Sequence, residues 1–300
     1  MPYTNVKGDF MKLLFIISFF LFSIITRAET LVFSFQKQKN PEDLKKATTA
    51  IAETLSKQIQ QKIEVLVPTS YGATAQGLIS NKVHVAFMDS LPFILASQET
   101  EIDVLVVEKR NGQTHYNSVF VVKKGSEIKS LKDLKGKSIA FSSQTSTSGY
   151  LFPFKRLLDE KLINNPTELK TFFSQIIYAG GYDKALLAVL NGQADVAAVS
   201  DYAIEGTKAD LYLAADQRSQ LEILTRTAGV PTHLVAISKK IPKQTQEKIR
   251  QALLNLSKEQ PELLSSVYGA AELVVPKGKH TEKTLEALNQ TGLNVKEFVK

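Results

Sequence analysis

Short apolar stretches alternate along most of the chain with stretches in which apolar residues recur every three or four positions. The first pattern is typical of buried strands and the second of amphipathic helices. We expect strands at 31–35, 63–67, 83–88, 102–107, 116–122, 138–141, 175–178, 194–199, 222–225 and 233–238. This alternation predicts an α/β protein with mainly parallel sheets covered by helices.

Several predicted helices carry recognisable boundary residues. Asn40-Pro41-Glu42-Asp43 combines an N-cap, a proline at the first helical position and acids in the first turn. We interpret Asp183 as the N-cap of a helix that ends at Gly192. Further helices are expected at about 148–161, at 244–256, at 262–268, and in the tail from 282.

The amino-terminal region has the pattern of a secretory signal peptide. Lys12 precedes an apolar run over 13–25, which is followed by Thr26-Arg27-Ala28. The run is shorter than the roughly 20 residues that a transmembrane helix needs. We therefore expect residues 1–28 to be a cleaved signal peptide, with Met11 as a plausible true start. The alternative is an uncleaved amino-terminal anchor.

The chain has no cysteine, so it has neither disulfides nor the lipidated cysteine that tethers many exported proteins. A free periplasmic protein is the best interpretation. The net charge of +7 comes from scattered lysines without interleaved aromatic residues, a pattern that argues against a nucleic-acid partner. Such a mild positive field would help to gather anions.

The common catalytic and metal-binding motifs are missing. There is no phosphate-binding Gly-x-x-x-x-Gly-Lys loop, no Gly-x-Ser-x-Gly elbow and no His-Glu-x-x-His pair. The four histidines stand apart without a second histidine or a cysteine at ligand spacing. We therefore predict no metal, no cofactor and no catalysis, and an enzyme on a two-lobed scaffold stays only as an unfavoured alternative.

The strongest local signal is the hydroxyl-rich loop Ser142-Ser143-Gln144-Thr145-Ser146-Thr147-Ser148-Gly149, between a predicted strand and helix. A helix start exposes unpaired N–H groups and the positive end of the helix dipole. Serine and threonine add donors, and a glycine permits a close approach of the backbone. The segment 146–149 is thus suited to a tetrahedral oxyanion, although it could also be an ordinary capped helix start.

Four other strand-to-helix or strand-end positions have related chemistry. Tyr71 lies before a helix, Tyr116 lies where the chain leaves the first set of strands, and Gly180-Gly181-Tyr182-Asp183 and Asp201 follow later strands. In open α/β sheets such loops converge on a cleft beyond the strand ends. Each tyrosine taken alone could equally be half-buried packing.

These residues resemble the periplasmic phosphate/phosphite/phosphonate-binding proteins of ABC transporters. Ser146-Thr147-Ser148-Gly149-Tyr150 followed by Pro153 is similar to the family's phosphonate-binding motif, and Tyr71 and Tyr116 are similar to its ligand tyrosines. Asp201 resembles an acid that accepts a ligand hydroxyl or amine. The resemblance implies a type II periplasmic-binding fold with two crossover strands as a hinge. It implies lobe one at 29–118 and 226–300 and lobe two at 119–225.

The resemblance also implies a monomer that hands a small phosphonate-like anion to an ABC permease and ATPase. Two residues depart from the family pattern. Tyr182 stands where relatives often have a histidine, and Asp89 adds an acid where many have a neutral residue. Asp89 is interpreted as a cap or as a partner for a ligand ammonium or protonated oxygen. The alternative functions are binding of another small solute and ligand sensing for a signalling partner.

Overall fold

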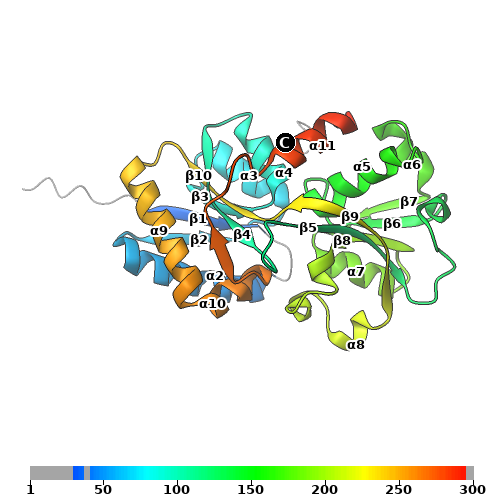
Figure 1. Ribbon diagram of the computed structural model, residues 1–300, viewed down its shortest axis with the longest axis horizontal. Helices are drawn as coiled ribbons and strands as arrows, with labels where there is room; N and C mark the ends of the chain where they lie inside the picture. Colours follow the sequence, from blue (N-terminus) through cyan, green and yellow to red (C-terminus); the bar gives the residue numbers. More distant parts are fainter. Residues whose placement is uncertain (1–29, 37–40, 295–300) are drawn as a thin grey trace, which may run out of the picture.

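The computed structural model describes residues 30–36 and 41–294. Two α/β lobes lie side by side along the long axis of the molecule, each built around its own sheet (Figure 1). The predicted signal peptide at 1–28 and the residues after 294 lie outside the described residues. Among the residues that the structure describes, no helix is both long enough and apolar enough to cross a membrane.

The sheet of the first lobe has the order β11-β4-β10-β3-β1-β2 within the described residues. Its strands are β1 (Leu31–Phe35), β2 (Ile63–Leu66), β3 (Val85–Met88), β4 (Ile102–Lys109), β10 (Leu234–Ser238) and β11 (Glu272–Val274). Strand β1 pairs in parallel with β2 and β3, whereas β10 runs antiparallel to β3 and β4. The helices of this lobe are α2 (Pro41–Ile59), α3 (Tyr71–Ile79), α4 (Ser90–Ser97), α9 (Lys243–Glu259) and α10 (Pro261–Tyr268).

The sheet of the second lobe has the order β7-β6-β8-β5-β9 in the described chain. Its strands are β5 (His115–Lys123), β6 (Ser138–Phe141), β7 (Gln175–Tyr178), β8 (Val196–Ser200) and β9 (Leu221–Pro231). Its main helices are α5 (Phe152–Asp159) and α7 (Tyr182–Leu190), and shorter turns are η1 (Leu131–Leu134), η2 (Thr147–Leu151), η3 (Pro166–Glu168), α6 (Leu169–Phe172), η4 (Asp201–Ala203), η5 (Ala209–Leu211) and α8 (Ala215–Arg218). The last helix, α11 (Glu282–Thr291), packs against both α4 and α5 and so touches both lobes.

The chain passes between the lobes twice, from β4 to β5 and from β9 to β10. Strands β5 and β9 pair with each other from His115 opposite Pro231 to Lys123 opposite Leu221, with two irregularities in the register. Both strands therefore belong to the second sheet over their whole length. The division at 118/119 and 225/226 that the sequence led us to expect cuts through these strands, and the exact lobe boundaries stay a prediction.

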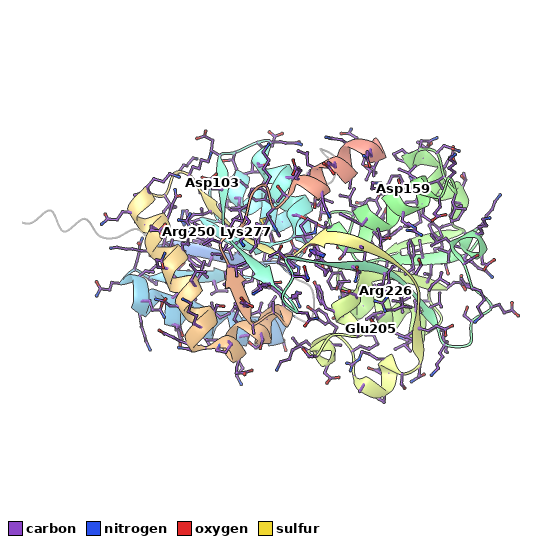
Figure 2. All side chains as sticks on the ribbon, viewed as in Figure 1. Asp103, Asp159, Glu205, Arg226, Arg250 and Lys277 are labelled. Atoms are coloured by element: carbon purple, nitrogen blue, oxygen red, sulfur yellow. The ribbon has the colours of Figure 1, made fainter. Side chains whose placement is uncertain are left out.

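Apolar side chains fill both faces of each sheet, and charged side chains project outward around the molecule (Figure 2). On the second lobe, for example, Glu205 and Arg226 form a partly exposed ion pair at 2.6 Å. Such exposed pairs contribute at most about 1 kcal/mol each. The stabilising free energy comes mainly from the buried apolar clusters on the two sheets.

Two local predictions were wrong. Asp183 is not the N-cap of α7, because the helix begins one residue earlier and its N-cap is Gly181. The strand β11 was not anticipated, since its three residues are held by pairing with β4 rather than by a strong apolar pattern of their own. The α/β architecture with two crossovers is otherwise the one that the sequence predicts.

Candidate functional site

The hydroxyl-rich loop follows the carboxyl end of β6 and forms a buried helix start. Ser146 has extended backbone angles, and its hydroxyl accepts a hydrogen bond from the Gly149 N–H at 3.0 Å. The turn Thr147–Leu151 is π-helical and continues into α5, where Pro153 lies in the first turn. Ser146, Thr147 and Ser148 are all fully buried. The loop is therefore both a capped helix start and a set of polar groups removed from water.

Gly149 has a packing role within the loop itself. A Cβ atom at this position would lie 2.3 Å from the hydroxyl oxygen of Ser142. Glycine is needed here because the serine-rich loop folds back on itself, so the close approach that the structure records is made by Ser142. A role of Gly149 in ligand binding stays a prediction.

The start of helix α4 in the first lobe faces this turn from the opposite side. The Leu91 N–H donates to the hydroxyl oxygen of Thr147 at 3.0 Å, and the hydroxyls of Ser90 and Thr147 lie 3.4 Å apart. Ser90 also pairs with Thr284 of α11 at 2.7 Å. Two helix N-termini, one from each lobe, therefore meet with their positive dipole ends close together, an arrangement that favours negative charge between them.

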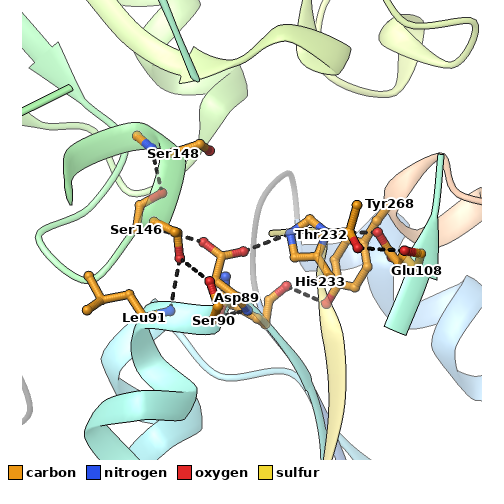
Figure 3. Close-up of polar contacts among 12 residues, drawn as sticks. Asp89, Ser90, Leu91, Glu108, Ser146, Ser148, Thr232, His233 and Tyr268 are labelled. Carbon is orange, nitrogen blue, oxygen red and sulfur yellow. Dashed lines mark hydrogen bonds and ion pairs between the residues drawn. The ribbon is translucent and has the colours of Figure 1, made fainter. Parts of the chain in front are cut away.

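Asp89 supplies a negative charge at this meeting point. It is the N-cap residue of α4, but its carboxylate makes no side-chain cap to that helix. Instead Oδ2 accepts a hydrogen bond from the Thr147 N–H of the other lobe at 3.3 Å, and Oδ1 lies 2.7 Å from Nε2 of His233 (Figure 3). The expected role of Asp89 as a simple satisfied cap is thus wrong, since its carboxylate bridges the two lobes.

Behind Asp89 a chain of charged groups runs into the first lobe. His233 Nδ1 lies 2.9 Å from Oε2 of Glu108 (Figure 3). Arg110 pairs with the same carboxylate at 3.0 Å. Burial opposes the charge of His233, but the carboxylates of Glu108 and Asp89 outweigh it and raise the pKa of His233 to about 9. Burial also opposes the charge of Glu108, yet Arg110 and His233 lower the pKa of Glu108. The imidazole is therefore a cation near neutral pH.

The predicted ligand tyrosines are buried around the same point. Tyr71 and Tyr182 have no exposed surface, and Tyr116 keeps only 6%. The Tyr182 hydroxyl lies 2.8 Å from the hydroxyl of Ser148. Burial, and then the charges of Tyr182 and Asp89, raise the pKa of Tyr71. Gly180 has a left-handed φ of 85°, which turns the chain before α7 and so directs Tyr182 toward the serine loop.

Several buried polar atoms at this end of the first lobe have no hydrogen-bond partner among the residues that the structure describes. They include the Tyr71 hydroxyl, the Nε2 amide of Gln36 and the hydroxyls of Ser34 and Thr74. Gln36 is held next to Asp89, because its Oε1 accepts from the Asp89 N–H at 3.1 Å. A buried polar group without a partner costs about 1–3 kcal/mol, so a cluster of them indicates a place that a polar ligand completes.

Both carboxylate oxygens of Asp201 accept hydrogen bonds from residues of the second lobe. Its Oδ2 accepts from the Asn117 side-chain amide at 2.6 Å, and its Oδ1 accepts from the Tyr202 N–H at 2.8 Å. These bonds connect the end of β8 with β5. The expected bond from Asp201 to a ligand hydroxyl or amine stays a prediction.

Sequence reasoning missed Gln36, Glu108 and the site role of His233. Gln36 directly follows β1, so the rule that ligands bind beyond strand ends could have identified it. Glu108 and His233 gave no local signal, because their partners come from distant parts of the sequence. The described residues contain no group of three or more histidines, cysteines or acids that could hold a metal ion.

These features define a two-lobed α/β binding protein whose polar site lies between the lobes. The chain belongs to the family of periplasmic substrate-binding proteins of ABC phosphonate transporters, whose sequence pattern matches residues 33–293. The family resemblance and the two-lobed fold predicted from the sequence are thereby confirmed.

Three curated relatives show the same affiliation. The phosphate-import protein PhnD of Mycolicibacterium smegmatis is 28% identical over 188 residues, covering 61% of this chain and 58% of that protein. The phosphonates-binding periplasmic protein of Escherichia coli is 25% identical over 235 residues, covering 77% and 67%. The probable phosphite-binding protein PhnD1 of Prochlorococcus marinus is 26% identical over 204 residues, covering 65% and 66%. The chain thus spans about three fifths to two thirds of the length of these relatives.

Solved structures support the fold. A binding component of an ABC phosphonate transporter from Pseudomonas aeruginosa has a TM-score of 0.76 at 17% identity, covering 87% of this chain and 86% of its own. PhnD1 from Prochlorococcus marinus in complex with methylphosphonate has a TM-score of 0.74 at 20% identity, covering 87% and 98%.

Proposed function

We propose that this protein captures a small phosphorus oxyanion between its two lobes and delivers it to an ABC importer, without catalysis. The family to which the chain belongs supports the role in import. The names of the relatives, which refer to phosphate, phosphonates and phosphite, support the ligand class. The exact ligand is left to experiment.

The observation that carries the proposal is the set of unpartnered buried donors beside two facing helix starts. The Tyr71 hydroxyl and the Gln36 amide are each fully buried and have no partner within the described residues 30–36 and 41–294. An oxyanion offers several acceptor oxygens, and it would satisfy such donors while it interacts with the dipoles of α4 and of the turn before α5. A neutral apolar solute would leave the donors unpaired.

The residues proposed to hold the ligand come from both lobes. Tyr71, Asp89 and the added candidate Gln36 belong to the first lobe. The second lobe supplies the remaining candidates, which are Tyr116, Ser146, Thr147, Ser148, Gly149, Tyr182 and Asp201. With Tyr182 in place of a histidine, the helix starts and hydroxyl groups would carry more of the stabilisation of the anion.

Calorimetry of the purified protein tests the proposal. We expect micromolar or tighter binding of at least one of methylphosphonate, phosphite, phosphate and 2-aminoethylphosphonate. No binding of any phosphorus ligand would refute the ligand class and favour another small solute. Phosphorus NMR of the bound ligand should show no turnover, and the appearance of a product would revive the enzyme alternative.

We also propose a cellular context, which the family membership supports. Residues 1–28 would be removed as a signal peptide, leaving a periplasmic monomer that is not lipidated and meets its permease and ATPase only transiently. Neighbouring genes for a permease and an ATPase would support import. A neighbouring sensor kinase would favour the alternative, in which the protein senses its ligand for a signalling partner.

A further inference from the structure

The Asp89 carboxylate is held in place from several directions. One oxygen is fixed by His233 at 2.7 Å and the other by the Thr147 N–H at 3.3 Å. The Asp89 backbone N–H is bound to Gln36 at 3.1 Å, and the residue is 1% exposed. His233 is itself fixed by Glu108 at 2.9 Å. Asp89 is therefore a rigidly held carboxylate paired with the imidazole of His233, and a carboxylate accepts hydrogen bonds.

The groups around Asp89 are one imidazole cation and several neutral phenols. The cation that faces it is His233, directly before β10, and behind His233 lie Glu108 on β4 and Arg110 directly after that strand. Four neutral phenols surround Asp89, which are those of Tyr71 at the start of α3, Tyr182 at the start of α7, Tyr116 in β5 and Tyr268 at the end of α10. Burial is the largest cause that raises the pKa values of these phenols, and Asp89 is one of the further causes. The pKa of Tyr212, which follows η5, is also raised by burial and, among other groups, by Asp89. None of these phenols ionises near neutral pH.

An anion bound at the Thr147 helix start must lie next to this carboxylate, because Asp89 accepts a hydrogen bond from the Thr147 N–H itself. A fully ionised oxygen would repel Asp89. An oxygen that carries a proton would instead donate a short, charge-assisted hydrogen bond to it. The unpartnered Tyr71 and Gln36 donors can serve the ionised oxygens of the same ligand. The site thus combines one fixed acceptor with several donors.

We infer that Asp89 makes the polar site between the lobes selective for an oxyanion that carries one acidic proton, such as a hydrogen phosphonate or hydrogen phosphate. This inference rests on the proposed function and specifies its ligand class. Sulfonates and sulfate have the same tetrahedral shape but no proton near neutral pH, so they are rejected. No proton is transferred in this step, because the ligand O–H only donates a hydrogen bond to Asp89.

The test compares methylphosphonate with methanesulfonate by calorimetry between about pH 6 and pH 9. As singly charged ions the two have the same tetrahedral shape, and only methylphosphonate carries a hydroxyl on its central atom. Methanesulfonate should bind at least roughly 10³-fold more weakly, as expected when a site built to pair with a hydroxyl meets an analogue that lacks it. A phosphate monoester loses its second proton at a pKa of about 6, and an alkylphosphonate, which has one electron-withdrawing oxygen fewer, loses its second proton at a higher pKa. Above that pKa the association constant for methylphosphonate should fall about tenfold per pH unit.

The Asp89→Asn variant should remove the discrimination. Its amide can still accept from His233 and can donate to an ionised oxygen, so the pH dependence should flatten and methanesulfonate should gain affinity. Asp103→Asn is the matched control, since Asp103 is a partly exposed acid paired with Lys239 on the outside of the first sheet. This control should behave like the wild type. If Asp89→Asn fails to fold, the wild-type comparison alone decides.

The outcomes separate this inference from the proposed function. Wild-type protein that binds no phosphorus oxyanion at any pH refutes both. Binding of methylphosphonate with no pH dependence, or of methanesulfonate within tenfold, overturns the role of Asp89 and leaves the proposed function standing. Affinity confined to aminoalkylphosphonates would assign Asp89 to a ligand ammonium and would also overturn the inference.

Discussion

The Leu91 N–H of the first lobe donates a hydrogen bond of 3.0 Å to the Thr147 hydroxyl of the second lobe. Both residues are fully buried, so the bond is formed away from water. It joins the start of α4 to the start of the turn before α5, the two elements whose dipoles face each other. This hydrogen bond can form only when the two lobes are together. Closure of the lobes is therefore coupled to the position of the two helix starts.

Thr147→Val keeps the shape of the side chain and removes its oxygen. The buried Leu91 N–H would lose its acceptor, a loss of about 1–3 kcal/mol that falls on the closed form. We expect ligand affinity measured by calorimetry to decrease roughly 10- to 100-fold. Thr145→Val is the matched control, because Thr145 is equally buried but its hydroxyl pairs only with Ser143 in its own loop. Equal affinities for the two variants would contradict a coupling role.

Ser146→Ala should reduce both stability and binding. The Ser146 hydroxyl caps the helix start by accepting from the Gly149 N–H, and loss of such a cap typically costs about 1 kcal/mol. Chemical denaturation should therefore show a lower free energy of unfolding, with a change in midpoint and not in slope. Ser174→Ala, at an exposed serine directly before β7, is the control and should leave the stability within about 0.5 kcal/mol of wild type. A Ser146→Ala variant as stable as wild type would show that the cap contributes little.

Local patterns predicted most of the fold. The strands at Leu31–Phe35, Ser138–Phe141 and Gln175–Tyr178 were delimited correctly because their apolar runs are bounded by polar or turn residues. Strand β9 was expected to end near Thr225, yet it continues to Pro231. Its extra length comes from pairing with β5, a distant contact that no local pattern encodes.

The site was predictable in part. The serine loop and Tyr71, Tyr116 and Tyr182 lie near strand ends or helix starts, where sequence patterns are informative. The partner of Asp89 was not predictable, because His233 lies at the start of a distant strand on the same sheet. An isolated histidine in a sequence is more often structural, and only the antiparallel pairing of β10 with β3 brings the two side chains together.

Tyr182→Phe tests the residue that replaces the family histidine. The change removes the hydroxyl that lies 2.8 Å from Ser148 and keeps the buried ring. Loss of one buried hydrogen bond of about 0.5–1.5 kcal/mol should weaken binding roughly 2- to 10-fold. Tyr212→Phe is the control, since Tyr212 is also buried but donates to the Tyr268 carbonyl at 3.3 Å. A larger loss of affinity in Tyr212→Phe than in Tyr182→Phe would count against a ligand role for Tyr182.

The charged chain through His233 makes stability depend on pH in a defined direction. The folded pKa of His233 is raised to about 9, above the value of about 6.5 expected in the unfolded chain. A raised pKa contributes stability that is fully present below about pH 6.5 and is lost as the pH rises through 9. The contribution is on the order of 3 kcal/mol, because each unit of pKa shift corresponds to about 1.4 kcal/mol.

The free energy of unfolding from urea denaturation should therefore decrease between pH 6.5 and 9.5. The His233 ring protons should titrate near pH 9 by NMR. His115→Gln serves as the control, since His115 is exposed and its removal should leave the pH profile unchanged. His233→Gln should flatten the profile and lower the stability at pH 6.5, because Asp89 and Glu108 would lose the cation between them. A His233 that titrates near pH 6.5, or a profile that stays flat in the wild type, would show that the imidazole does not hold its charge between the two acids.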